Sequence, residues 1–148
     1  MIHSHRDIFK YEVPNDWYVG YEQEHLQIYN EKVGLGALTA SFYVNLEWPR
    51  HSSKVAENMA QSFINQYQVK LFHPMKWNKI SNSTNVFVGE GVQGEYYVRM
   101  WVIVDHLRII LATYFSEQHF DDDIKLSPEL ENEVAQFESI INSITFLN

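Results

Sequence analysis

The sequence predicts an α+β fold in which helices pack on both faces of an antiparallel β-sheet. Between residues 96 and 115, apolar side chains occupy both alternating sets of positions, so a hairpin formed there has two apolar faces. Two other segments, residues 55–67 and 130–144, carry apolar residues at helical spacing. A sheet with water on one face shows a cleaner alternation of apolar and polar residues. We therefore expect a helix to cover each face, as in an α/β/α sandwich.

The central hairpin, residues 96–115, is predicted to turn at Asp105 and His106. This turn places four cross-strand pairs on one face: Val104 with Leu107, Val102 with Ile109, Met100 with Leu111, and Val98 with Thr113. The opposite face receives Tyr97, Trp101, Ile103, Ile110, Ala112 and Tyr114, and the only charged residues there are Arg99 and Arg108.

Four strands are predicted before the first helix, at residues 8–13, 17–21, 25–29 and 37–46. Pro14 ends the first of them because its ring fixes φ. The fourth is the clearest, since apolar and polar side chains alternate along its whole length. Two more strands, residues 76–80 and 86–90, are predicted between the first helix and the hairpin.

The first helix is expected to begin at Ser52 and Ser53, and its apolar stripe consists of Val55, Ala56, Met59, Ala60, Phe63, Ile64 and Tyr67. A loop is expected at residues 116–126. The second helix follows, with Ser127 suited to the N-cap and Pro128 to the first helical position. The predicted order of elements is β-β-β-β-α-β-β-β-β-α, and residues 144–147 should follow the second helix as a short extended tail.

Length and composition favour a single domain spanning residues 1–148. Hydrophobic residues make up 45% of the chain, which excludes disorder, and the absence of cysteine excludes disulfides and thiolate metal sites. The formal charge of −8 and the lack of a Lys/Arg cluster argue against nucleic-acid binding. No apolar run has signal-peptide or membrane-spanning length, so we expect an acidic cytoplasmic protein that does not bind membranes.

Three segments resemble the Mog/PsbP-like superfamily, which includes the photosystem II PsbP proteins, Ran-binding Mog proteins and DcrB-like bacterial proteins. The opening Phe9-Lys10-Tyr11-Glu12-Val13-Pro14-Asn15-Asp16-Trp17 resembles the entry of such domains, residues 96–115 their long hairpin, and residues 137–146 their closing helix and tail. The resemblance implies an antiparallel sheet between helices, in a bacterial member of unknown function that serves as a binding scaffold. It supplies no catalytic residues. Because the chain shows neither the targeting segment nor the lipobox Cys of secreted relatives, the resemblance implies no photosystem or envelope role.

His119, with Asp121, Asp122 and Asp123, is the strongest candidate for a metal site, because imidazole and carboxylates bind divalent ions. Their spacing matches neither an EF-hand loop nor a zinc motif, and an acidic, solvated loop explains them equally well. No serine lies in a Gly-x-Ser-x-Gly elbow. We therefore expect no catalytic residues, no cofactor and no metal.

Aromatic residues on the second hairpin face are the best candidates for a binding site. Tyr97, Trp101 and Tyr114 share that face with Arg99, a composition typical of interaction hot spots. Tyr43 and Trp48 are further candidates, in a groove between sheet and helix. Strands of this length extend about 30 Å, and a helix of roughly 15 residues covers only about 22 Å. Some of the three hairpin aromatics should therefore protrude; the alternative is that a helix covers all of them.

The predicted function is that of a non-catalytic domain that binds another protein, as an adaptor for example, or binds a second copy of itself as a homodimer. The main alternative is a pocket for a small apolar or aromatic ligand, and a third is an enzyme of unrecognised type. A flat aromatic patch would indicate the first, an enclosed pocket the second. Converging titratable residues would indicate the third.

Overall fold

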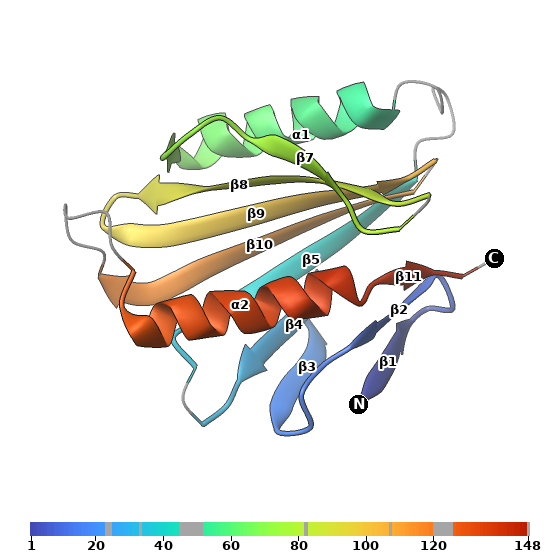
Figure 1. Cartoon of the computed structure of the whole chain (residues 1–148), viewed down its shortest axis with the longest axis horizontal. Coiled ribbons are helices and arrows are strands. Elements are labelled where there is room, and N and C mark those ends of the chain that lie inside the picture. The colour runs from blue at the N-terminus through green and yellow to red at the C-terminus, as the bar shows by residue number, and fades with distance from the viewer. Residues whose placement is uncertain are drawn as a thin grey trace.

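The computed structural model describes residues 1–22, 25–32, 34–44, 52–81, 83–106, 108–119 and 126–147. Within them lie two antiparallel sheets and two helices (Figure 1), which confirms the predicted α+β class. The elements in chain order are β1 (Ile2–His5), β2 (Phe9–Glu12), β3 (Trp17–Glu22), β4 (His25–Asn30), β5 (Gly36–Val44), α1 (Ser52–Tyr67), β6 (Lys70–Leu71), β7 (Lys76–Lys79), β8 (Asn85–Gln93), β9 (Tyr96–Asp105), β10 (Arg108–His119), α2 (Pro128–Asn142) and β11 (Thr145–Phe146).

The large sheet has eight strands in the order β3-β4-β5-β10-β9-β8-β6, and β7 also pairs with β8. The helices α1 and α2 lie on opposite faces of this sheet (Figure 1), as the sandwich prediction requires. A second sheet, in the order β1-β2-β11, packs beside α2 and brings together segments from opposite ends of the sequence.

The central hairpin is formed by β9 and β10, but its register differs from the prediction by two residues. Asp105 pairs with Arg108, and Val104 with Ile109. The turn therefore lies at residues 106 and 107, and Leu107 is outside the described residues. Two features favour this turn: the Arg108 guanidinium donates a hydrogen bond to the Asp105 carboxylate, and His106 has a φ of 50°, as two-residue hairpin turns require. A shift of two residues keeps every side chain on its predicted face.

Three segments predicted as loop or left unassigned are strands. Strand β10 continues to His119, because Ser116 pairs with Gly36 of β5 and His119 with Tyr96 of β9. Strands β1 and β6 lack an apolar alternation that would have revealed them. In β1, the rings of His3 and His5 instead stack on aromatic rings of β2. The predictions for residues 45–46 and 120–125 fall outside the described residues.

One face of the large sheet is covered across its width by α2 and the small sheet. The Phe137 ring of α2 packs on Tyr114 and Trp17, with ring centroids 4.9 and 5.0 Å apart. Phe9 and Tyr11 of β2 join the same cluster. Helix α2 begins as predicted, since the Ser127 hydroxyl accepts a hydrogen bond from the backbone N–H of Leu130.

The opposite face is covered mainly over β8, β9 and β10, where α1 packs. The buried residues of α1 are Ala56, Ala60 and Phe63, and they meet Val98, Met100, Val102, Val104 and Ile109. On β4 and β5, Leu26, Ile28, Leu38 and Ala40 point to the α2 side and are buried, and Phe42 is half-buried there. The side chains that point to the α1 side are half-buried or exposed. Helix α1 therefore leaves part of its sheet face uncovered.

Replacing Phe137 with Ala should lower the free energy of unfolding by about 3–5 kcal/mol, because removing a fully buried ring leaves a cavity. Urea unfolding followed by tryptophan fluorescence measures the loss. Glu131→Ala, on the exposed side of the same helix, is the control and should change stability by less than about 1 kcal/mol. A loss near zero for Phe137→Ala would contradict the packing of α2.

Candidate functional site: a groove beside helix α1

A groove of about 710 Å³ lies between α1 and strands β4, β5 and β10, on the partly uncovered sheet face. Its apolar and aromatic lining consists of Tyr43, Val55, Met59, Phe63, Tyr67 and Leu111, and its polar lining of His25, Thr39, Ser41, Asn58, Ser62, Gln66 and Thr113. Its volume falls within the range of about 300–1,000 Å³ that is usual for ligand sites.

The sheet forms the floor of the groove through alternate residues of β5 and β10. Thr39 lies beside Thr113, Ser41 beside Leu111, and Tyr43 beside Ile109. Because Ile109 belongs to the core under α1, its neighbours on the same face point to the α1 side as well. The polar half of the alternating β5 sequence therefore faces the groove.

Helix α1 forms the wall. Asn58, Ser62 and Gln66 are spaced one helical turn apart, so they form an exposed row along the helix. Met59 and Phe63 lie beside this row, nearer the sheet. At the end of the helix, the Tyr67 ring packs on Phe63 at a centroid separation of 4.7 Å.

The polar groups of the groove keep most of their capacity for hydrogen bonds. His25 Nδ1 and Ser41 Oγ lie 2.7 Å apart. In the part of the chain that the structure describes, no hydrogen bond is made by the side chains of Thr39, Ser62 or Gln66. No Lys, Arg, Asp or Glu is among the described lining residues, so the groove presents uncharged donors and acceptors.

The open sheet face extends from the groove onto β4 and β3. Gln27 of β4 pairs with Thr39, and Gly20 of β3 pairs with Gln27. The Tyr18 and Tyr29 rings stack with centroids 4.6 Å apart. The Tyr18 ring also lies over Gly20, where a Cβ atom would come within 2.1 Å of the hydroxyl oxygen. We call this surface the tyrosine face; it comprises Tyr18, Gln27, Tyr29, Thr39, Ser41 and Tyr43.

The prediction that Tyr97, Trp101 or Tyr114 protrudes is wrong, because all three are 0% exposed. That prediction compared the strands with one helix alone. The small sheet extends the cover beside α2, and Phe72, which follows β6, packs on Tyr97 with ring centroids 6.3 Å apart. These three residues are part of the core.

Tyr43 is the predicted binding residue that the structure brings to the groove, where it remains 44% exposed. Trp48, Asp121 and the side chain of His119 lie outside the described residues. Within the described ranges, no three His, Asp or Glu residues lie close enough together to hold a metal ion. Neither α1 nor α2 has the length and apolar content of a membrane-spanning helix.

Sequence reasoning missed the α1 row of Asn58, Ser62 and Gln66. The signal was present, since these three residues are uncharged and lie directly beside the apolar stripe of the helix. Their role in a groove depends on where β5 lies in the sheet, and residue spacing within α1 carries no information on that.

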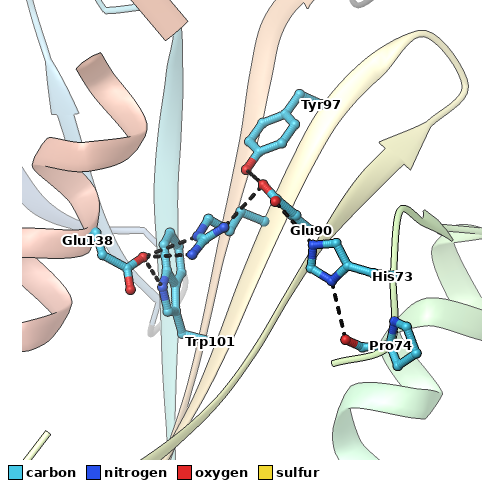
Figure 2. A network of polar contacts seen from close by, with 7 residues as sticks. His73, Pro74, Glu90, Tyr97, Trp101 and Glu138 are labelled. Carbon is cyan, nitrogen blue, oxygen red and sulfur yellow. Dashed lines mark hydrogen bonds and ion pairs between the residues drawn. The ribbon is translucent and has the colours of Figure 1, made fainter. Parts of the chain in front are cut away.

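Arg99, also predicted as a binding residue, instead joins the sheet to α2 in a polar network (Figure 2). Its guanidinium lies 3.1 Å from one carboxylate oxygen of Glu90 and 3.1 Å from one of Glu138. Trp101 Nε1 donates to the same Glu138 oxygen at 2.8 Å. The Tyr97 hydroxyl donates to Glu90, and burial, together with this carboxylate, raises the pKa of Tyr97. Because each carboxylate has several donors, the network acts as a tether for α2.

Replacing Arg99 with Met should destabilise the fold by about 2–3 kcal/mol, since it leaves two partly buried carboxylates without their cation. This figure is at the low end for such pairs because the three side chains keep 18–31% of their surface exposed. A double-mutant cycle with Glu138→Gln, measured by urea unfolding, tests the coupling. If Glu138→Gln costs as much in the Arg99→Met background as in the wild type, the tether is refuted.

A second tether, formed by Glu133 of α2, holds the beginning of β5. The buried Glu133 carboxylate accepts a hydrogen bond from the Leu35 N–H at 2.6 Å. Burial raises the pKa of Glu133, and the N–H groups of Leu35 and Gly36 oppose this effect only in part. The folded protein therefore retains the Glu133 proton at pH values where the unfolded chain has lost it.

Glu133→Gln should remove a pH-dependent cost to stability. For an acid whose pKa is raised on folding, stability is highest below the unfolded pKa of about 4.3 and falls as the pH rises toward the folded value. Gln does not ionise, so the variant should gain stability relative to the wild type as the pH rises from about 4 to 7. Urea unfolding at several pH values measures this difference, with Glu131→Gln as the exposed control. A difference that does not change with pH would show that folding leaves the pKa of Glu133 unshifted.

A large antiparallel sheet between two helices, with a small sheet beside one of them, defines an α+β sandwich, and similarity to a solved PsbP structure shows a PsbP-like fold. The solution structure of cyanobacterial PsbP (CyanoP) from Synechocystis sp. PCC 6803 is similar, with a TM-score of 0.66 and 10% identity over 99% of this chain and 91% of that one. A crystal structure from Bacteroides thetaiotaomicron VPI-5482 has a TM-score of 0.62 and 12% identity over 95% of this chain.

The chain spans only 45% of the length of the Bacteroides protein. No family model matches the sequence, and no curated protein matches it. At 10–12% identity, the likeness shows the fold alone. It confirms the PsbP-like resemblance carried by the opening segment, the long hairpin and the closing helix.

Proposed function

We propose that this chain is a non-catalytic domain that binds another protein through the groove and the adjoining tyrosine face. The observation that carries the proposal is the composition of an uncovered sheet surface. Tyrosines supply large contact areas at low entropic cost, and Ser and Asn side chains supply adaptable hydrogen bonds. Large contact areas come from Tyr18, Tyr29 and Tyr43, and adaptable hydrogen bonds come from Ser41 and Asn58.

The chemistry of the groove supports binding in preference to catalysis. His25 is the one histidine among the described lining residues, and its ring lies against the Ser41 hydroxyl. General acid–base catalysis uses a positioned proton donor or acceptor, commonly working with a second titratable group. The described lining offers no carboxylate, Lys or Arg to act with His25.

Charge favours a different protein over a second copy as the partner. Each chain carries a formal charge of −8, so two copies repel one another at long range. A partner with basic residues around its contact surface would be attracted to the acidic domain, and this attraction speeds association.

A small apolar or aromatic ligand is the second candidate, and the groove volume of about 710 Å³ favours it. Such ligands bury most of their surface in a concave site. The tyrosine face extends onto β3, beyond the groove, and a small ligand leaves that extension without a role.

Gln27→Glu should weaken binding of the partner about tenfold or more, because a carboxylate at the centre of the tyrosine face would lose water without gaining a counter-charge. Glu has nearly the same shape as Gln, so the fold should be unaffected. Pull-down from a lysate of the source organism identifies the partner, and calorimetry with the purified partner measures its affinity.

The matched control is Gln61→Glu, which places the same charge on an exposed position of α1 that does not line the groove. It should bind like the wild type. Equal affinity of the wild type and Gln27→Glu would refute the tyrosine face as the interface. Sedimentation of the isolated chain tests the homodimer, because self-association that is lost in Gln27→Glu would identify the partner as a second copy.

A further inference from the structure

We propose that the groove beside α1 binds an extended, uncharged segment of the partner, about five or six residues long. This inference rests on the proposed protein-binding function and specifies which kind of segment enters the groove. The dimensions of the groove, its hydrogen-bonding groups and its lack of charge each support it.

The length of the groove suits a short extended segment. Its α1 wall runs from Val55 to Tyr67, about 18 Å at 1.5 Å per residue. A strand of that length has about five or six residues, at about 3.3 Å per residue.

The polar groups suit a peptide backbone. An extended segment presents N–H and C=O groups along both edges, and each needs a partner when water is removed. Hydroxyl and amide side chains can both donate and accept hydrogen bonds. Thr39 and Ser41 offer such groups from the floor, and Asn58, Ser62 and Gln66 offer them from the wall. The groove therefore provides partners on two sides of a single strand.

The lack of charge in the groove limits which side chains the bound segment can carry. Met59, Phe63 and Leu111 offer apolar contacts, and the described lining holds no Lys, Arg, Asp or Glu to pair with a buried charge. Alternate side chains of a strand point the same way. The segment should therefore carry apolar residues at every second position and no charged residue among those that enter the groove.

The test uses a pool of random ten-residue synthetic peptides, applied to the immobilised full chain, with the bound peptides identified by sequencing. Three proteins are compared: the wild type, Ser62→Arg and Gln61→Arg. Both substitutions add the same charge at exposed, adjacent positions of α1, but only Ser62 lines the groove. Asn58→Lys, in the same row, is a second groove variant, and thermal melting checks that each protein is folded.

The wild type and Gln61→Arg should enrich the same peptides, poor in charged residues and apolar at every second position. Ser62→Arg and Asn58→Lys should bind these peptides about tenfold more weakly. Peptides that are apolar at every third and fourth position would assign the groove to a helix and overturn the inference. Enrichment of charged peptides, no enrichment, or binding by both groove variants as tight as that of the wild type would also overturn it. The proposed function fails separately, when Gln27→Glu leaves the affinity for the natural partner unchanged.

Discussion

The need to keep water from both faces of one hairpin determines the architecture of this chain. Strands β9 and β10 are apolar on each side, and neither side is stable until another element covers it. The aliphatic face, with Val98 and Met100, is met by the small side chains of α1, which allow close approach of the helix. The aromatic face is met by Phe137 of α2 and by side chains from the small sheet.

The two covers differ in width, and this difference creates the candidate site. On the α2 side, the small sheet extends the cover to β3 and β4, so Leu26 and Ile28 are buried. On the α1 side, one helix packs mainly over β8 to β10, and the same two outer strands present Tyr18 of β3 and Gln27 and Tyr29 of β4. The proposed binding surface is thus the part of the sheet that needed no cover for stability, because its residues are polar or aromatic with a polar end.

Sequence periodicity predicted which face each residue of β9 and β10 occupies, because alternation is a local property of a strand. It did not predict the register, which depends on the Asp105–Arg108 ion pair across the turn. It could not reveal β1, whose His3 and His5 are ordered by rings of β2. The burial of Tyr97 depends on Phe72, which follows a strand too short to show a period. The groove could not be predicted from periodicity, because it depends on the strand order, which places β5 beside β10.

The small sheet also determines the order in which the molecule is assembled. Thr145 pairs with Lys10, and Phe146 with Phe9, so closing this sheet constrains almost the whole chain. Loop-closure entropy makes such a pairing slow, whereas the β9–β10 hairpin closes through a two-residue turn. The hairpin and its helices are therefore expected to form before β11 reaches β2. Until then Phe9 lacks one of its aromatic neighbours, so completion of the cover on the α2 side waits for the last strand of the sequence to dock.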